Sequence, residues 1–475
     1  MSNGFLGVKG IKLKVKYVAL GLAVLILAYA SLILLPYTGA AFVSQETRDS
    51  FAIDRFYGQQ QTAERVMLLE DPQESFYHRI NLVSQATHEI FFTSYKVNRG
   101  YTSDIFIGAL LAAAERGVQV YMICNATFGS ISSYYSRVLS AHENISLYLF
   151  NPFNLFQPQF INASMHDKYV LADNHMLILG GRNIGDRYFN PDNHEGNVAY
   201  DREVLVYNTD PMFNGAIYQV RNYFEEKRFS SRVTLQSRST NDTLDSRKNH
   251  LISAYNAFTQ GHSSFGIFDY YVNTIPAYAI TLITNPVNTA KKESVVAFNL
   301  LMLAKNSSQI IAQSPYVVFT NRNMQHFADA VEGREVILST NSLGSTPNLP
   351  AFANYHISRR RLLDTGITIY EFQSSNVSLH GKTYLFDGRL TVIGSFNMNE
   401  RSIRSDTESV LVIDSPAFHD IVAGAIDVNI SNSLRVNSSN TYDYREYVDP
   451  VSVTWGRRTF FTTIGWLIRP FRILS

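Results

Sequence analysis

Two short stretches of the sequence carry the same reactive side chains at the same spacing. In each, a His-x-Lys triplet is followed after four residues by Asp and, after six more, by Gly-x-x-Asn. The first copy contains His166, Lys168, Asp173, Gly180 and Asn183, and the second contains His380, Lys382, Asp387, Gly394 and Asn397. A single His-x-Lys triplet has no diagnostic value, but two copies with matched offsets indicate a function that needs two histidine–lysine pairs.

The side-chain types of the repeat suit chemistry on a phosphodiester. The two lysines can neutralise its charge and the charge that develops during displacement, and the two asparagines can donate hydrogen bonds to the same oxygens. Ser395 is a further candidate phosphate ligand, although Gly181 stands at the matching place in the first copy and offers no side chain. His and Lys two residues apart on a strand also point to the same side.

The two histidines can divide the work of a covalent mechanism. One imidazole can attack phosphorus, while the other protonates the leaving alcohol and later deprotonates the incoming one. With an unperturbed pKa of about 6.5, imidazole suits both tasks near neutral pH. A nucleophilic histidine needs an acceptor on its other ring nitrogen. Glu203 and Glu408, each on the strand expected after its motif, are candidates for this orienting role, with an exposed strand carboxylate as the alternative.

The acids within the repeat have two possible roles. Asp173 and Asp387 are candidate catalytic residues, but both follow the motif strand at an expected turn, so a turn-forming role is equally open. The arrangement needs no metal, and the sequence has no HExxH, no paired-acid cluster and no Cys/His set with ligand spacing. Its one cysteine, Cys124, cannot form an intramolecular disulfide and is expected to be a buried strand residue.

Strand-like and helix-like segments alternate around each copy of the motif. In the first half, strands are expected at 90–95, 118–123, 168–172, 176–179 and 203–207, with helices at 104–116 and 213–226. In the second half, strands are expected at 309–318, 335–339, 367–372, 383–386, 390–393 and 408–413, with helices at 324–331 and 355–364. The pattern predicts an α/β fold in which each half forms one lobe with a largely parallel sheet.

An uncharged run from Tyr17 to Leu35 follows four lysines near the N-terminus, Lys9, Lys12, Lys14 and Lys16. At about 1.5 Å per residue, a helix over this run can cross the ~30 Å hydrocarbon core of a bilayer. The preceding lysines predict a cell-membrane anchor with a cytoplasmic N-terminus and the catalytic lobes on the outer side. A cleaved signal peptide, with the small residues Gly39-Ala40-Ala41 after the apolar run, is the competing interpretation.

The C-terminal segment 436–475 differs in composition from the rest of the chain. Its last 23 residues contain both tryptophans and four arginines, but no acid. This composition suits an interfacial helix on a membrane, and a terminal helix docked on the protein is the equal alternative. The expected division is a basic segment (1–16), an anchor (17–36), a first lobe (44–227), a linker (228–260), a second lobe (261–435) and this amphipathic tail.

Longer segments around the two motifs resemble the phospholipase D superfamily and, within it, the bacterial cardiolipin synthases of the C type. The resemblance is carried by residues 166–168, 172–174, 180–189, 314–316, 340–343 and 394–402. It implies a two-lobed α/β/α monomer with an internal duplication and one central active site, and phosphatidyl transfer through a phosphohistidine without metal or cofactor. It assigns His166 as the nucleophile and His380 as the acid/base. Lys-Val-Asn-Arg at 96–99 stands where a more acidic loop is expected, which leaves the acceptor open.

The expected function is that of a membrane-bound phosphatidyltransferase that makes cardiolipin from two phospholipids, one of them phosphatidylglycerol. A hydrolytic phospholipase D, or another phosphodiesterase of the same superfamily, is the alternative, in which water replaces the accepting alcohol. The net charge of +1 disfavours a nuclease, because nucleic-acid partners require a basic surplus. Two intact motifs argue against a protein without catalytic activity.

Overall fold

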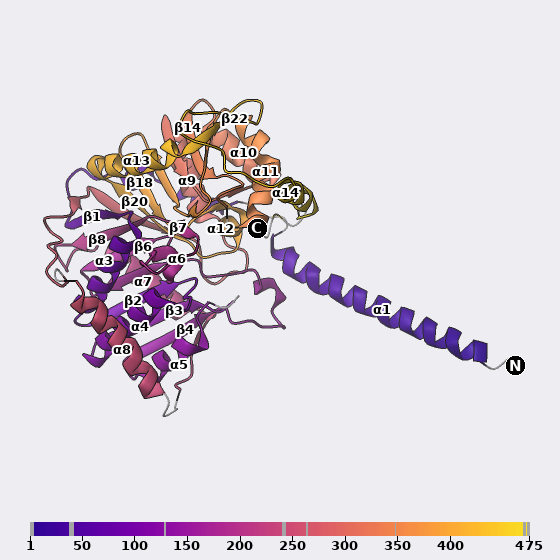
Figure 1. Cartoon of the computed structure of the whole chain (residues 1–475), viewed down its shortest axis with the longest axis horizontal. Helices are drawn as coiled ribbons and strands as arrows, with labels where there is room; N and C mark the ends of the chain where they lie inside the picture. Colours follow the sequence, from indigo (N-terminus) through magenta and orange to yellow (C-terminus); the bar gives the residue numbers. More distant parts are fainter. Residues whose placement is uncertain are drawn as a thin grey trace.

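The computed structural model describes residues 4–37, 42–127, 130–239, 244–262, 265–346, 348–468 and 472. The globular part consists of two α/β lobes, each built on a nine-stranded sheet, and a long N-terminal helix projects away from them (Figure 1). The α/β/α architecture with two similar lobes is therefore as predicted.

The two sheets have corresponding strand orders, which confirms the internal duplication. The first sheet runs β10 (Ile275–Pro276), β1 (Glu64–Leu69), β8 (Glu203–Asn208), β6 (Met176–Gly180), β5 (Tyr169–Ala172), β2 (Glu89–Ser94), β3 (Gln119–Asn125), β4 (Ile145–Phe150) and β9 (Val233–Leu235). The second runs β11 (Ala279–Thr284), β20 (Ser409–Asp414), β18 (Leu390–Gly394), β17 (Thr383–Phe386), β12 (Gln309–Gln313), β14 (Glu335–Asn341), β15 (Thr368–Phe372), β21 (Ser433–Val436) and β22 (Tyr442–Asp443). The series from β1 to β4 and from β11 to β15 match strand for strand.

Both sheets are mixed, whereas the alternation of strands and helices predicted largely parallel ones. Among the described strands of these sheets, parallel pairing is confined to β2–β3–β4 and β12–β14–β15. The motif strands are antiparallel hairpins, β5–β6 and β17–β18. Asp173 and Asp387 at their turns have φ of 53° and 50°, the left-handed conformation that Asp tolerates in tight turns.

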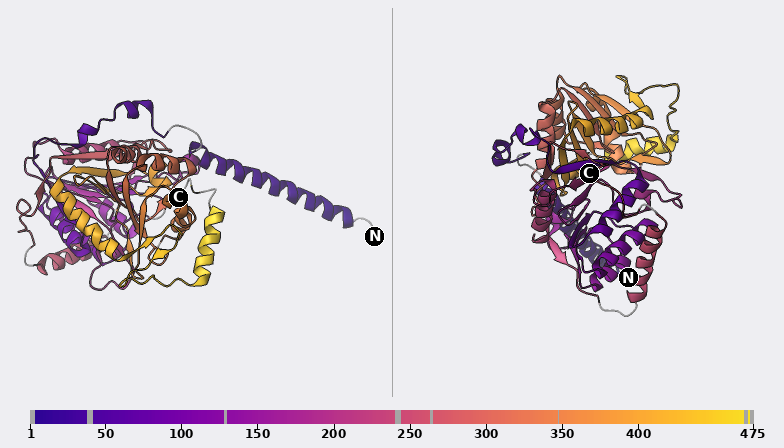
Figure 2. Two further views of the ribbon diagram at one scale, coloured as in Figure 1. Left: turned by 90° about the horizontal axis from the view of Figure 1, so that it is seen from above. Right: turned by 90° about the vertical axis from the view of Figure 1, so that its left-hand side faces the viewer.

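Helices cover both faces of each sheet (Figure 2). The first lobe has α3 (Pro72–Gln85), α4 (Tyr101–Glu115), α5 (Ser133–Ala141), α6 (Asp186–Phe189), α7 (Ala216–Arg228) and α8 (Leu244–Gln260). The second has α9 (Val295–Lys305), α10 (Asn321–Val331), α11 (Leu349–Leu363), α12 (Glu400–Arg404), α13 (Pro416–Ser431) and α14 (Trp455–Ile468). Ile217 and Val220 of α7 share one apolar cluster with Phe418 and Val422 of α13, so the lobes are joined by a continuous core.

Residues 244–260, expected within a linker, form helix α8 of the first lobe. A Cβ on Gly108 of α4 would lie 2.0 Å from Leu251 O, so glycine allows α8 to approach closely. Leu244, Leu251 and Tyr255 are the buried side chains of α8. Because β10 then pairs with β1, the first lobe extends to Pro276 and the second begins with β11.

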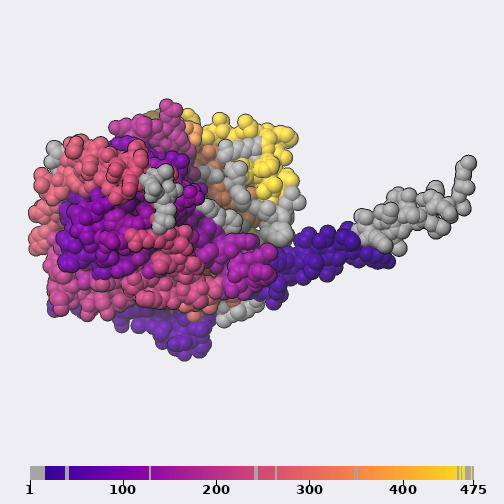
Figure 3. All heavy atoms as spheres, turned by 90° about the horizontal axis from the view of Figure 1, so that it is seen from below, coloured from indigo at the N-terminus to yellow at the C-terminus, as the bar shows by residue number. Residues whose placement is uncertain are grey.

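Helix α1 (Gly4–Leu34) contains the apolar run and projects from the globular part (Figure 3), which it contacts near its C-terminal end, where the Tyr29 hydroxyl donates to Leu155 O at 3.1 Å. The segment Lys16–Tyr37 is long and apolar enough to cross a membrane, with a mean hydropathy of 2.7. It ends in a short turn, η1 (Leu35–Tyr37), where Tyr37 is 2% exposed. Phe42 and Val43 enter the core of the second lobe, while Gly39, Ala40 and Ala41 lie outside the described residues. The chain on both sides of the candidate cleavage site is thus built into the globular part.

The C-terminal tail forms α14, which docks on α11 and also exposes aromatic side chains. Phe461 is 1% exposed, and its ring centroid lies 6.0 Å from that of Phe352, edge to face. Trp455 and Phe460 are exposed. The face of α14 that carries Phe461 is therefore docked on the protein, as one alternative predicted, and membrane contact through the exposed Trp455 and Phe460 stays a prediction. The predicted interfacial residues that lie outside the described side chains are Arg457, Arg458, Trp466 and Arg469.

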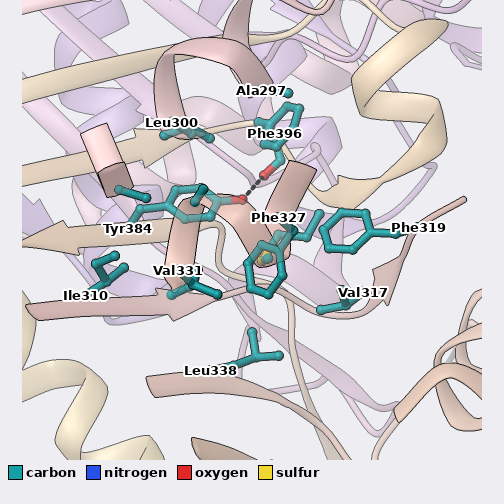
Figure 4. Close-up of a cluster of buried hydrophobic side chains, with 14 of the residues drawn as sticks. Ala297, Leu300, Ile310, Val317, Phe319, Phe327, Val331, Leu338, Tyr384 and Phe396 are labelled. Carbon is teal, nitrogen blue, oxygen red and sulfur yellow. Dashed lines mark hydrogen bonds between the residues drawn. The ribbon is translucent and has the colours of Figure 1, made fainter. Parts of the chain in front are cut away.

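The core of the second lobe lies directly behind its motif. Side chains from α9, α10 and the sheet pack together there, including Leu300, Ile310 and Phe327 (Figure 4). Within this core the Tyr384 hydroxyl donates to Phe396 O at 3.0 Å. This hydrogen bond fixes the backbone just before the motif asparagine.

Candidate active site

His166 lies at the junction of the two lobes, beside a carboxylate from the opposite lobe. Its Nδ1 is 3.1 Å from each carboxylate oxygen of Glu408. The backbones are also joined, because His166 N donates to Thr407 O at 3.1 Å and Thr407 N donates to Ser164 O at 2.9 Å. With Nδ1 engaged, Nε2 is the ring nitrogen that can face a substrate. The predicted orienting role of Glu408 fits this geometry, with the histidine of the other lobe as its partner.

His380 has the corresponding arrangement. Its Nδ1 makes a short contact with Asp201 Oδ2, and its backbone N donates to Tyr200 O at 2.7 Å. A parallel pair of short strands, β7 (Val198–Tyr200) and β16 (Val377–Leu379), brings these residues together. Each histidine is therefore backed by an acid from the other lobe, and both lobes are needed to complete either half of the site.

By strand register, the counterpart of Glu408 is Asp201 and not Glu203. The motif glycine at the end of the hairpin pairs with Glu203 in the first sheet and with Val410 in the second. Two residues before these partners stand Asp201 and Glu408. The prediction that Glu203 orients a histidine is therefore wrong, and Asp201 is the functional candidate that the sequence analysis missed.

Glu203 is instead fully buried among cations at the start of β8. Its carboxylate accepts from Arg79 Nη2 at 2.7 Å and from the Ser75 hydroxyl at 2.6 Å, and it lies 3.4 Å from Arg182 Nη1. Because Ser75 and Arg79 belong to α3, this cluster ties the helix to the sheet. We infer a structural role for Glu203.

The two motif lysines are buried at the same junction. Lys168 and Lys382 are each 1% exposed, and each Nζ donates to the backbone carbonyl of the histidine two residues earlier. Burial removes hydration from the ammonium groups and lowers the pKa of Lys168 to about 7 and that of Lys382 to about 8. The charge of Lys382 contributes to the lowering at Lys168, so the two cations repel each other. An anion bound between them relieves this repulsion.

Burial also lowers the pKa of both imidazoles. The pKa of His166 falls well below its usual 6.5, and that of His380 falls to about 4, in each case helped by the lysine of the same motif. Both rings are therefore neutral near pH 7 in the free protein. The acids behind them differ: burial raises the pKa of Glu408, whereas at Asp201 the effect of burial is outweighed by Lys382 and His380, which lower it. The two histidine–acid pairs are thus not equivalent.

The motif asparagines also differ in their surroundings. Asn397 is 3% exposed, and its Oδ1 has no hydrogen-bond partner within the part of the chain that the structure describes. The Asn183 side chain is engaged on both sides, accepting from Lys96 N at 3.0 Å and donating to the Tyr188 hydroxyl at 3.1 Å. Asn397 is therefore the amide better placed to change partners when a phosphate binds.

Ser395 supports Glu408 and is not free to bind phosphate, which corrects its predicted role. Its hydroxyl donates to Glu408 Oε2 and accepts from Ser409 N at 3.0 Å. In the first lobe, Asp201 fills the corresponding space, because a Cβ on Gly181 would lie 2.3 Å from Asp201 Oδ1. The serine–glycine difference between the motifs thus follows from the acid that stands beside each one.

Asp173 and Asp387 lie at the far end of the motif strands from the histidines. Asp173 follows Lys168 by five residues, which is roughly 16 Å along an extended strand. Its carboxylate accepts from the backbone N–H groups of residues 87–89 at 2.9 to 3.0 Å, and Asp387 accepts from those of residues 308–309 at 2.8 Å. Each aspartate ties the hairpin turn to the start of the neighbouring strand. Of the two roles that the sequence left open, this placement favours the turn-forming role over the catalytic one.

Asp173→Ala is expected to lower stability while leaving the turnover of the folded protein nearly unchanged. Losing its charge-assisted hydrogen bonds should reduce the free energy of unfolding by about 2–4 kcal/mol. These bonds outweigh burial and lower the pKa of Asp173 below 3.8. Its stabilisation is therefore present above the unfolded pKa of about 3.9 and lost as pH falls through the folded pKa. Thermal unfolding and initial rates, measured also for Asp387→Ala, check this; a hundredfold loss of kcat at unchanged stability would contradict it.

Two tyrosines that the sequence analysis did not assign to the site lie against the histidines. The ring centroid of Tyr95 is 5.3 Å from that of His166, and Tyr188 is 5.6 Å from His380, both edge to face. Tyr95 follows the last residue of β2 directly. Its position at the carboxyl end of a parallel strand is the signal that could have identified it.

A pocket of about 600 Å³ opens beside His380. Its lining combines polar and apolar side chains, and includes Arg187, Tyr188, His380, Phe460, Phe461 and Ile464. The last three residues belong to α14. The tail helix therefore contributes directly to the surroundings of the second histidine.

A protein-family model described as "Cardiolipin synthase, PLD-like domain" matches residues 80–226 and 298–427, which include both motifs. Cardiolipin synthase C of Escherichia coli K12 is 26% identical over 402 residues, covering 74% of this chain and 82% of its own. An uncharacterized protein of Helicobacter pylori strain 26695 is 28% identical over 401 residues, covering 74% and 76%. These matches extend over both lobes.

A solved structure supports the same fold. The phosphatidylserine synthase of Haemophilus influenzae Rd KW20 superposes with a TM-score of 0.61, covering 86% of this chain and 95% of that protein. At 14% sequence identity, this likeness concerns the architecture alone. Among the residues described, no group of three or more His, Cys, Asp or Glu side chains is arranged to hold a metal ion.

Proposed function

Because the chain belongs to the PLD-like domain family of cardiolipin synthases, we propose that it is a membrane-bound phosphatidyltransferase that makes cardiolipin from two phospholipids. The observation that carries the proposal is the paired arrangement at the lobe junction. Each histidine has a carboxylate of the opposite lobe on Nδ1 and a buried lysine two residues later. A double displacement at phosphorus needs one group to bond phosphorus and another to move protons, and the site supplies both.

In the first half-reaction, His166 Nε2 attacks the phosphorus of the donor phospholipid. The N–P bond forms as the bond from phosphorus to the leaving alcohol breaks, and His380 gives its proton to the alcohol oxygen. The two motif lysines and Asn397 stabilise the negative charge on the phosphate oxygens. Glu408, held on Nδ1, stabilises the positive charge that His166 acquires.

In the second half-reaction, His380 takes the proton from a hydroxyl of the second phospholipid as its oxygen attacks the phosphohistidine. The new P–O bond forms, the N–P bond breaks, and His166 is regenerated. The charge of a bound phosphate raises the pKa of His380 from about 4 towards neutrality. Asp201, whose own pKa is lowered, stabilises the imidazolium that His380 forms in each cycle.

Phospholipid substrates are supported by the anchor and by the pocket. The apolar helix α1 keeps the enzyme at a membrane, and the aromatic wall of α14 borders the pocket beside His380. We assign phosphatidylglycerol as one substrate, and an N-terminus in the cytoplasm with the lobes on the outer side. Both halves of the site come from one chain, so a monomer suffices for catalysis.

The function is tested by incubating the purified full-length protein with labelled phosphatidylglycerol in mixed micelles. Cardiolipin and glycerol are the expected products, in equal amounts, because each transfer releases one glycerol. Phosphatidic acid as the sole labelled product would contradict the proposal and indicate a hydrolytic phospholipase D.

We expect kcat/KM to decrease with rising pH, beginning between about pH 7 and pH 8. The pKa values of Lys168 and Lys382 are about 7 and about 8, so rising pH removes the charges that bind phosphate. Protonation of His166 removes the nucleophile only well below pH 6.5, which places the acidic limb there. Initial rates at low substrate concentration give the profile, and activity that still rises above pH 9 would be inconsistent with it.

A further inference from the structure

The pocket beside His380 is lined by an arginine that the proposed chemistry at phosphorus does not use. Arg187, on the short helix α6, lines this pocket together with His380, and Phe460, Phe461 and Ile464 of α14 contribute apolar side chains to its lining. A charged group, a proton acceptor and an aromatic surface thus share one cavity. This combination matches a ligand with an anionic headgroup, a hydroxyl and a hydrocarbon part.

Arg187 lacks the partners that normally compensate a half-buried guanidinium. Its Nη2 donates to Ser378 Oγ at 3.0 Å and to Asn197 Oδ1 at 3.3 Å, both neutral groups. Its Nε is buried and has no hydrogen-bond partner among the residues that the structure describes. A guanidinium removed from water without a counter-charge is costly. An anion such as phosphate can accept hydrogen bonds from the terminal nitrogens of this guanidinium and supply the missing counter-charge.

Arg401, another arginine near the centre, has a charged partner within the protein. It pairs with Asp406, with Nη2–Oδ1 at 3.0 Å and Nε–Oδ2 at 3.3 Å, and also donates to Asn162 and Ser164. Its charge is compensated within the protein. Arg187 is therefore the better candidate to receive an anion from outside.

We propose that Arg187 binds the phosphate of the accepting phospholipid and that α14 packs against its acyl chains. The inference rests on the proposed function, in which His380 takes the proton from the accepting hydroxyl. An acceptor such as phosphatidylglycerol carries its free hydroxyls and its own phosphate on one small headgroup. Because Arg187 and His380 line the same cavity, the phosphate can bind Arg187 while a hydroxyl reaches His380 Nε2. Arg187 then selects an anionic lipid over water or a neutral alcohol.

The test compares two acceptors in the full-length protein, with labelled phosphatidylglycerol as donor and either phosphatidylglycerol or ethanol as acceptor. Arg187→Gln is expected to lower the ratio of kcat/KM for the lipid acceptor to that for ethanol by roughly ten- to hundredfold. Arg187→Lys, which keeps the charge and loses the planar fork, should give an intermediate ratio. Arg116→Gln is the matched control, because Arg116 is exposed and donates to Ser84 O at the end of α3, and its ratio should equal that of the wild type. An unchanged ratio for Arg187→Gln would overturn the proposal.

A binding measurement separates this inference from the proposed function. Titration of short-chain phosphatidic acid into the detergent-solubilised protein needs no turnover, so it applies even if the wild type makes no cardiolipin. Arg187→Gln should weaken this binding about tenfold and leave that of inorganic phosphate at the motif lysines within about twofold. If Arg187→Gln weakened the binding of inorganic phosphate equally, Arg187 would bind a free anion. If both proteins bound phosphatidic acid equally, Arg187 would not be a ligand of the lipid. Either result would overturn the proposal that Arg187 binds the accepting phospholipid.

Discussion

His166→Ala is expected to lower phosphatidyl transfer by roughly four orders of magnitude or more and to abolish the phosphoenzyme. In the proposed mechanism this ring is the group that bonds phosphorus, and alanine leaves no atom to replace it. Its Nδ1 is held by Glu408, so Nε2 is the ring nitrogen that attacks. The substitution removes a nearly buried ring, so a thermal unfolding curve must accompany the rates. Acid quenching destroys phosphohistidine, and the intermediate is therefore trapped from labelled donor in alkaline denaturant.

His380→Ala is the matched variant that distinguishes the two histidines. It should lose about 10²- to 10⁴-fold in transfer, because proton donation and removal are lost. With a phosphatidyl ester of p-nitrophenol, whose leaving group needs no proton, this variant should still form the phosphoenzyme and accumulate it. A phosphoenzyme in His166→Ala and none in His380→Ala would reverse the two assignments.

Much of the architecture follows from the sequence, because the two copies of the His-x-Lys motif lie at corresponding places in two similar lobes. Matched offsets from histidine to Gly-x-x-Asn place each motif on one hairpin, and the two sheets share their strand order. The antiparallel pairing could also have been inferred. Asp173-Asn174 and Asp387-Gly388 are strong signals for a tight turn, and a tight turn joins antiparallel strands. Strand–helix alternation outweighed that signal and led to the expectation of largely parallel sheets.

Helix α8 was not predicted from the sequence, because the polar residues in its first turns obscure the periodicity of its few buried apolar residues. The buried residues Leu244, Leu251 and Tyr255 recur at helical spacing, but most residues between 236 and 250 are polar. The close approach to α4 at Gly108 depends on tertiary packing. Local composition cannot show such a contact.

The acid that contacts each histidine could be identified only from the strand register in the structure. From the motif glycine to the acid there are 21 residues in the first lobe, Gly180 to Asp201, but 14 in the second, Gly394 to Glu408. The Asp210-Pro211 and Ser415-Pro416 pairs that follow these strands suggest an alignment of Glu203 with Glu408, which differs by two residues from the register in the structure. The pairing of each acid with the histidine of the opposite lobe depends on how the lobes assemble, through Met165–Thr407 and Leu379–Tyr200. No local pattern in the sequence encodes that assembly.

Asp201→Asn and Glu203→Gln are therefore expected to have opposite consequences, although only one residue separates the two acids. Asp201→Asn should lower kcat by roughly 10²- to 10⁴-fold, because an amide cannot stabilise the imidazolium of His380 and can donate to Nδ1, which favours the wrong tautomer. Glu203→Gln should leave the kcat of the folded protein within about threefold. It should lower the free energy of unfolding by about 3–5 kcal/mol, because Arg79 and Arg182 lose their buried counter-charge.

Denaturant unfolding and single-turnover kinetics on both variants separate these effects. If Asp201 acts through His380, Asp201→Asn should slow the attack of the second alcohol on a preformed phosphoenzyme and have less effect on its formation from the p-nitrophenyl ester. A purely structural role would slow both steps together. The converse result, a large catalytic defect in a stable Glu203→Gln and none in Asp201→Asn, would restore the assignment first drawn from the sequence. The strand register between the lobes predicts the catalytic defect in Asp201→Asn and not in Glu203→Gln, because it places Asp201 on His380 Nδ1 and Glu203 among arginines of its own lobe.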